Sequence, residues 1–102
     1  MKKVIGVCAC PTGIAHTYMA ADAIEQAAKN MGYDYKVETQ GSIGIEDRLT
    51  EQDIKEADLI IITAAVKIRE SERFDDYKDK LIEVPLQTTI ARIDEIIKEK
   101  IG

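Results

Sequence analysis

The chain has 102 residues, enough for one compact domain over residues 1–102. Its composition is 45% hydrophobic but only 5% aromatic, so the core must consist mainly of Ile, Val, Leu and Ala. The net charge is −5 with no basic tract, which argues against a nucleic-acid partner, and the apolar runs are too short to span a membrane.

The first part of the chain predicts a strand, a helix and a second strand. Residues 4–8 form a short apolar run, typical of a parallel strand covered on both faces and too short for a secretory signal peptide. Residues 17–31 have one apolar and one polar face, and Gly32 after them is a common helix stop. Residues 35–39 predict the second strand. Two glycines and a serine then indicate a loop over residues 40–44.

The residues around position 50 carry the signals of a helix start. Thr50 and Asp53 have the spacing of a capping box, and Leu49 and Ile54 occupy the two positions of a hydrophobic staple. Residues 59–63 follow with four consecutive branched aliphatic residues, which predict the third strand.

The last part of the chain begins with a polar region. Residues 68–77 are only loosely helical in pattern. A solvated face is expected for the charged side chains here, which include Arg69, Arg73, Lys78 and Lys80. Residues 81–84 predict a fourth strand that ends at Pro85, and residues 88–100 predict the last helix. The apolar stripe of that helix consists of Leu86, Ile90, Ile93, Ile97 and Ile101.

Alternation of strands and helices predicts an α/β fold. We expect a three-layer sandwich with a four-stranded parallel sheet, in the order 2-1-3-4, and helices on both faces. Ligands of such sheets bind at the carboxyl ends of the strands, where the strand order switches. The segment after residue 8 and the loop over residues 40–44 leave neighbouring strands at this rim, so we expect them to lie side by side.

The segment after the first strand carries the strongest chemical signal. It consists of Cys10, Pro11, Thr12, Gly13, Ile14, Ala15, His16 and Thr17. A cysteine at a strand end, before a helix start, faces unpaired backbone N–H groups that lower a thiol pKa and bind phosphoryl oxygens. Gly13 lets the backbone close around an anion, and Thr12 and Thr17 add hydroxyls, with Thr17 also a candidate helix cap. These features predict that Cys10 is a nucleophile that can carry a phosphoryl group.

Two further residues near Cys10 in the sequence, His16 and Cys8, are candidates for a role. His16, the only histidine, either returns toward the anion or faces solvent at the helix start. Cys8 is expected to be a small apolar core residue. Cys8 and Cys10 lack both the spacing of a redox pair and the further ligands of a zinc site, so no metal and no cofactor is expected. Two cysteines without a disulfide framework favour a reducing, cytoplasmic setting.

The loop over residues 40–44 is the second candidate region. It is either a plain turn or a binding loop beside Cys10. In the second case, phosphate or a partner protein would be held by Gln40, Gly41 and Ser42.

The residue types after Cys10 bear on whether a phosphoryl group there would be transferred or hydrolysed. In cysteine-dependent phosphatases an arginine follows the cysteine and a loop of five residues, and it clamps phosphate with two hydrogen bonds. Here His16 stands at that position, and no Asp-Pro pair is present to supply the general acid. A cysteine that accepts phosphate without machinery for hydrolysis suits a phosphoryl carrier.

The sequence resembles the EIIB domain of the fructose-specific branch of the bacterial phosphoenolpyruvate-dependent sugar phosphotransferase system. The resemblance covers nearly the whole chain. It is carried by residues 9–21, by residues 37–44, and by the pairs Leu49-Thr50, Asp53-Ile54 and Ala57-Asp58.

The resemblance implies a phosphocysteine at Cys10. A phosphohistidine on an EIIA partner would donate the phosphoryl group, and a sugar bound by the membrane-embedded EIIC partner would receive it. Fructose is the implied sugar, with mannitol-like or mannosyl sugars as alternatives. The family usually has an acidic residue shortly after the third strand, where this chain has Val66, and this departure bears on the sugar and on partner docking. Two other functions stay open: a hydrolase like the low-molecular-weight cysteine phosphatases, and a non-catalytic interaction module.

Overall fold

A mixed sheet forms the centre of the protein. The structure, a computed structural model, describes residues 2–9, 15–41, 44–64 and 66–102, and these residues form five strands in the order β3-β2-β1-β4-β5. Strands β2, β1, β4 and β5 are parallel to one another, and β3 is an antiparallel edge strand. The strands are β1 (Lys3–Ala9), β2 (Asp34–Gly41), β3 (Gly44–Glu46), β4 (Leu59–Ala64) and β5 (Leu81–Glu83).

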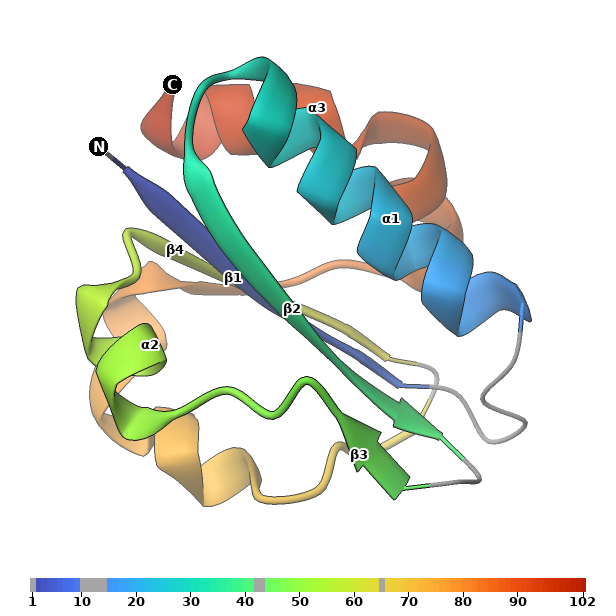
Figure 1. Cartoon of the computed structure of the whole chain (residues 1–102), viewed down its shortest axis with the longest axis vertical. Coiled ribbons are helices and arrows are strands. Elements are labelled where there is room, and N and C mark those ends of the chain that lie inside the picture. Colours follow the sequence, from blue (N-terminus) through green and yellow to red (C-terminus); the bar gives the residue numbers. More distant parts are fainter. Residues whose placement is uncertain (1, 10–14, 42–43, 65) are drawn as a thin grey trace.

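Helices cover both faces of the sheet (Figure 1). Helices α1 (Ala15–Asn30) and α3 (Leu86–Ile101) lie together on one face. Helix α2 (Glu51–Glu56) and the 3₁₀ segment η1 (Ser71–Lys80) cover the other. The predicted three-layer α/β architecture is therefore confirmed. None of the described helices combines the length and apolar character that crossing a membrane requires.

Alternation along the central strand β1 divides the core into two layers. Val4 and Cys8 pack with α1 and α3, whereas Ile5 and Val7 pack with the apolar residues of α2 and η1. All four are fully buried, as expected for a parallel strand covered on both faces. Gly6 between them lets α1 approach closely, since a Cβ there would lie 3.0 Å from Cδ1 of Ile24.

The start of α2 confirms the predicted capping box. The Asp53 amide donates to Thr50 Oγ1 at 3.1 Å, and the Thr50 amide donates to Asp53 Oδ2 at 2.9 Å. Leu49 and Ile54, the two residues of the predicted staple, are both buried in the layer between the sheet and η1. The cap thus fixes where α2 begins and brings its apolar side onto the sheet.

The structure corrects the four-strand prediction around residues 40–44. Gln40 and Gly41 are the last two residues of β2. Gly44 begins an additional strand, β3, and pairs with Gly41. Gly44 has φ +109°, a backbone conformation that glycine adopts readily. A three-residue edge strand contains too few residues to show alternation, so its sequence resembles a loop. Ser42 lies outside the described residues.

Three helix boundaries also differ from the prediction. Helix α1 begins at Ala15, so Thr17 lies inside its first turn and is not its cap. Helix α3 begins at Leu86, directly after Pro85, whose fixed φ suits a helix start. The polar region is a 3₁₀ segment that begins at Ser71 rather than a helix over residues 68–77. Only Phe74 is buried in it, so it offers no apolar stripe to predict from.

The capping box gives a first prediction. Thr50→Ala should lower the free energy of unfolding by about 1 kcal/mol, because the Asp53 amide loses its acceptor. Urea unfolding followed by circular dichroism measures this change. Thr88→Ala, which removes a threonine hydroxyl from the first turn of α3, is the control. An equal loss in both variants would contradict the role assigned to the cap.

Candidate functional site

The carboxyl ends of three parallel strands meet at one rim of the sheet. Ala9, the last residue of β1, pairs with Gln40 on β2 and with Ala64 on β4. The segment that follows β1 therefore leaves the sheet between the ends of β2 and β4, as the topology predicts. Within that segment, Cys10, Pro11, Thr12, Gly13 and Ile14 lie outside the described residues. Ala15 and His16 form the start of α1, and their side chains are not described.

Thr17 is the first residue after this segment whose side chain is described. It lies in the first turn of α1, and only 1% of its surface is exposed. Its Oγ1 is buried and has no hydrogen-bond partner among the described residues. A buried hydroxyl without a partner costs about 1–3 kcal/mol, so such groups are normally paired. Near the start of α1, the described residues thus leave one buried hydroxyl without an acceptor.

The first turn of α1 is also tied to the edge of the sheet. The Tyr18 hydroxyl donates to the carboxylate of Glu46 on β3, and this hydrogen bond raises the pKa of Tyr18. Thr39 Oγ1 lies 3.4 Å from the same carboxylate. Tyr18 and the neighbouring Met19 remain 43% and 51% exposed. The rim therefore presents apolar side chains to solvent directly beside the helix start.

Gln40 is buried, and its side-chain amide is fully engaged. Its Nε2 donates to Glu38 at 2.8 Å and to the carbonyl oxygen of Arg69 at 3.1 Å. Its Oε1 accepts from the Arg69 amide at 2.7 Å. The side chain thus links β2 to the segment that follows β4. Any contribution of Gln40 to the site comes from this link, because its own polar atoms are already used.

Glu38 and Arg73 form the charged centre of this region. Each carboxylate oxygen of the fully buried Glu38 accepts from one guanidinium nitrogen of Arg73, at 2.8 Å in both cases. The Leu49 amide adds a third donor at 2.9 Å. Burial alone would raise the pKa of Glu38, but the hydrogen bonds from Arg73, Gln40 and Leu49 outweigh it and hold that pKa below its ordinary value.

The expectation of a solvated charged face between residues 69 and 80 is therefore wrong for Arg73. The pairing joins residues 35 positions apart, so no local pattern indicates it. The one available signal is the row of polar residues at alternate positions on β2, namely Lys36, Glu38 and Gln40. The neighbouring strand β1 is apolar after its first residue. A polar row beside a fully buried strand indicates either a solvent face or a buried network, and the sequence alone does not distinguish them.

Cys8 is the apolar core residue that was expected. It is fully buried between the sheet and α1, and this burial raises the pKa of its thiol to about 12. At neutral pH it carries no thiolate and is inert. Among the described residues, no three His, Cys, Asp or Glu side chains come together in a way that would hold a metal ion.

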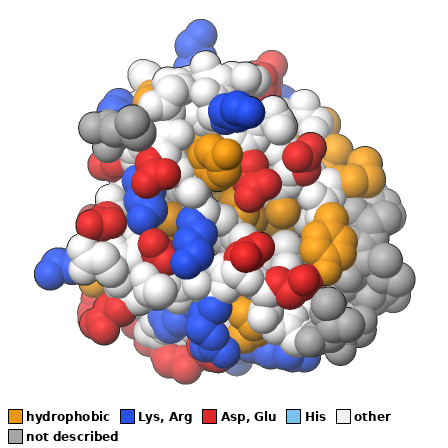
Figure 2. Space-filling view, viewed as in Figure 1, with side chains coloured by type: hydrophobic (Ala, Val, Ile, Leu, Met, Phe, Trp, Pro, Cys, Tyr) orange, Lys and Arg blue, Asp and Glu red, His pale blue; other side chains and the backbone are white. Residues whose placement is uncertain are grey.

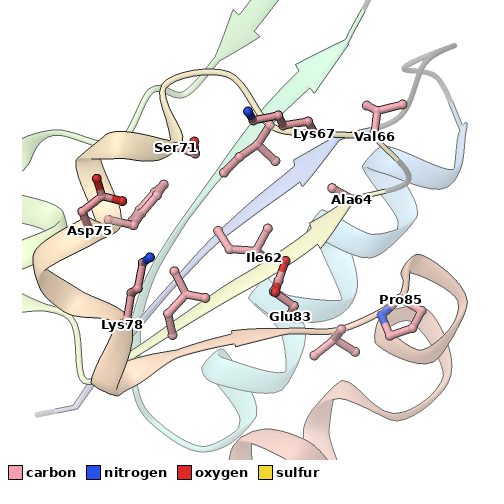
Figure 3. Close-up of a pocket in the computed structure, with 13 residues that line it drawn as sticks. Ile62, Ala64, Val66, Lys67, Ser71, Asp75, Lys78, Glu83 and Pro85 are labelled. Atoms are coloured by element: carbon pink, nitrogen blue, oxygen red, sulfur yellow. The ribbon is translucent and has the colours of Figure 1, made fainter.

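A cleft of about 780 Å³ opens beside the rim, at the carboxyl ends of β4 and β5 (Figure 3). Its apolar lining includes Ile62, Phe74 and Leu81. Val66 and Lys67, which follow β4, form its upper wall in Figure 3. Acidic and basic side chains are also interspersed over the face of the protein in Figure 2, with no patch of one sign. These surfaces suit contacts with protein better than with a polyanion.

Comparisons with known proteins agree on one family. The family described as "PTS system, Lactose/Cellobiose specific IIB subunit" matches residues 5–99. The "PTS system fructose-like EIIB component 1" of Escherichia coli K12 is 52% identical over 98 residues, which cover 96% of this chain and 89% of that protein.

Solved structures lead to the same family. The solution structure of an Enzyme IIB subunit of the PTS system from Escherichia coli K12 has a TM-score of 0.89 at 51% identity and covers 96% of this chain and 89% of its own. A domain of a fructose-specific IIABC component from Borrelia burgdorferi has a TM-score of 0.87 at 45% identity, with coverage of 97% and 92%. An arginine phosphatase matches 97% of both chains at a TM-score of only 0.57 and 12% identity, which is a likeness of fold alone.

The buried charge pair gives the second prediction. Arg73→Met should destabilise the protein by about 3 kcal/mol, because it leaves the buried carboxylate of Glu38 without its main partner. Arg92→Met, which breaks an exposed ion pair with Glu95, should cost less than about 1 kcal/mol. Both values follow from denaturant unfolding at neutral pH.

The destabilisation caused by Arg73→Met should depend on pH. The folded-state pKa of Glu38 lies below its ordinary value of 4.5, so its stabilising contribution is complete above that pH and is lost as the pH falls further. In Arg73→Met the unpaired carboxyl instead gains from protonation. The stability difference between wild type and Arg73→Met should therefore shrink on acidification. A difference that stays constant with pH would contradict the charge pairing.

Proposed function

Because this chain belongs to the IIB subunits of the sugar phosphotransferase system, with fructose-like EIIB components among its relatives, we propose that Cys10 is its phosphorylated residue. The chain is a phosphotransferase. Its 102 residues act as one phosphoryl-carrying domain, which receives the group from an EIIA component and passes it to a sugar held by an EIIC component. We expect it to act in the cytoplasm, at the inner face of the membrane that holds EIIC.

The proposed reaction has two displacements at phosphorus. The Cys10 thiolate attacks the phosphohistidine of EIIA, so that an S–P bond forms as the N–P bond breaks and the histidine takes up a proton. A hydroxyl of the sugar then attacks the phosphocysteine, loses its proton, and releases the thiolate. The backbone N–H groups between Thr12 and Thr17 would bind the phosphoryl oxygens in both steps, with Pro11 stiffening the exit from the cysteine.

Thr17 is the observation that supports this site most directly. Its buried Oγ1 has no partner among the described residues and lies in the first turn of the helix that follows the cysteine segment. The amino end of α1 also favours negative charge, by about 0.3–1 kcal/mol in exposed settings. An anion at Cys10, whether thiolate or phosphoryl group, would supply the missing acceptor.

Transfer is favoured over hydrolysis by the residue at the arginine position of phosphatases. His16 stands there, so the bidentate clamp that arginine gives to phosphate is absent from this sequence. The likeness to an arginine phosphatase at 12% identity concerns the fold and does not bear on the reaction. We also propose that the end of β2 and the loop after it face the partner proteins. The candidate residues there are Gln40, Gly41 and Ser42.

The third prediction concerns the phosphorylated residue. With a phosphohistidine donor protein, intact mass should show one added phosphoryl group on the wild type and on Cys8→Ala, and none on Cys10→Ala. The two variants are matched because each replaces one of the two thiols by a methyl group. Labelling that survives Cys10→Ala would refute the proposal. Steady phosphate release from an aryl phosphate without any donor protein would instead identify a hydrolase.

The fourth prediction separates stability from transfer at Thr17. Thr17→Val should leave the free energy of unfolding unchanged or higher, because it removes a buried hydroxyl that has no partner among the described residues. Phosphoryl transfer from the donor should nevertheless slow about tenfold, the effect of one lost hydrogen bond to a charged group.

Thr89→Val is the matched control for Thr17→Val. Thr89 is equally buried, but its hydroxyl already has a partner, since it donates to Thr63 at 2.9 Å. This variant should lose stability and keep its transfer rate. Unchanged transfer in Thr17→Val would remove Thr17 from the site.

A further inference from the structure

The hydrogen bonds of Gln40 cross the end of the strand that leads to Cys10. We propose that Gln40 is a positioning residue for phosphoryl transfer: it fixes the end of β2 and the segment after β4 relative to each other across the end of β1, and so shapes the surface that the donor protein contacts. This inference rests on the proposed function of Cys10, and it assigns Gln40 a role other than contact with phosphate.

The register of the sheet places the Gln40 link directly beside the last residue before Cys10. Ala9 pairs with Gln40 on one side and with Ala64 on the other. Paired residues of parallel strands direct their side chains to the same face, so Gln40 and Ala9 share the face that carries Val7. From there Gln40 reaches Arg69, which follows β4, and so spans the width of β1. The small, buried side chain of Ala9 leaves room for this crossing.

The chemistry of its neighbours fixes the orientation of the Gln40 amide. The ionised carboxylate of Glu38 only accepts hydrogen bonds, so the nitrogen of the amide must face it, at 2.8 Å. The oxygen then faces the Arg69 amide at 2.7 Å. Arg73 holds Glu38 in place through two further hydrogen bonds. Glutamine is thus required as donor and acceptor at once, which neither an apolar residue nor a carboxylate provides.

The segment that Gln40 holds is part of the partner-facing surface. Val66, Lys67 and Ile68 line the cleft beside the rim, and Arg69 directly follows them. Val66 is 43% exposed. Losing the link would loosen both the end of β2 and this wall of the cleft without removing the nucleophile. We therefore expect weaker recognition of the donor, seen as a higher KM, with little change in kcat.

The first test measures the link itself and needs no partner protein. In Gln40→Met, the Arg69 amide loses its acceptor, so its hydrogen exchange measured by NMR should accelerate about tenfold, as expected for one buried hydrogen bond. Gln52→Met is the matched control, since the Gln52 amide also donates to a carboxylate, Glu56 at 2.7 Å, but on the exposed side of α2. The control should leave Arg69 exchange unchanged.

The second test measures transfer from the phosphorylated donor. Gln40→Met should raise the KM for the donor several-fold at nearly constant kcat, at a temperature where all variants are folded. Gln52→Met should match the wild type. A wild type that accepts no phosphoryl group would refute the proposed function, whereas a functional wild type with an unchanged KM in Gln40→Met would overturn only the positioning role.

The third test uses Gln40→Glu, whose carboxyl group has the shape of the amide. When ionised, it faces the like charge of Glu38 and the carbonyl of Arg69 without a proton to donate. When protonated, it has one donor for Glu38 and one acceptor for the Arg69 amide, and so restores two of the three hydrogen bonds that Gln40 makes. The other charged groups of this cluster are Arg73, Glu70 and Arg48. Burial and the neighbouring carboxylate should raise the pKa of the introduced group.

Transfer by Gln40→Glu, taken relative to wild type at the same pH, should therefore recover as the pH falls from about 8 toward about 5.5, the direction set by a raised carboxyl pKa. Gln40→Met should show no such recovery. A defect due only to lost packing would be the same for both variants at every pH, and that result would overturn the proposal.

Discussion

The buried ion pair between Glu38 and Arg73 is the constraint on which the rim of the sheet depends. Removing a carboxylate from water is costly, and the cost is offset only where its oxygens are fully hydrogen-bonded. Here Arg73, Gln40 and the Leu49 amide all donate to it. Because these donors come from η1, from the residue before the α2 cap and from the end of β2, all three segments must contact Glu38. This face of the sheet therefore holds a fully paired charge next to an apolar core layer.

The parts of the fold that follow from local physics could be predicted from the sequence. Short apolar runs gave the buried parallel strands, and the pair Thr50 and Asp53 marked the start of α2, because these signals lie within a few residues of one another. The edge strand β3 was missed and the bounds of η1 were misplaced for the opposite reason. Three residues cannot show alternation, and a segment anchored by Phe74 alone has no apolar stripe. What stabilises them is a set of contacts from distant parts of the chain.

The same distinction applies to the candidate site. The topology predicts which strand ends meet, and Ala9, Gln40 and Ala64 do lie side by side. Whether a polar side chain at that rim binds a ligand or holds the scaffold depends on its partners, and these are long-range. Gln40 has all its polar atoms engaged within the protein, whereas the buried hydroxyl of Thr17 has no partner among the described residues. Residue type and position alone made the two look like equivalent candidates.

The two cysteines lie two residues apart in the sequence, and we propose opposite chemistry for them. Cys8 lies in the core, where burial raises the pKa of its thiol to about 12 and abolishes its reactivity. Cys10 comes two residues later, after the last residue of β1 and before the amino end of α1. The donors of such a helix start stabilise a thiolate and a phosphocysteine alike. A site that binds both states with similar strength adds little to the free-energy difference between them, so the group can pass on as readily as it arrives. This balance is what a phosphoryl carrier requires, and an arginine clamp in place of His16 would shift it toward retention.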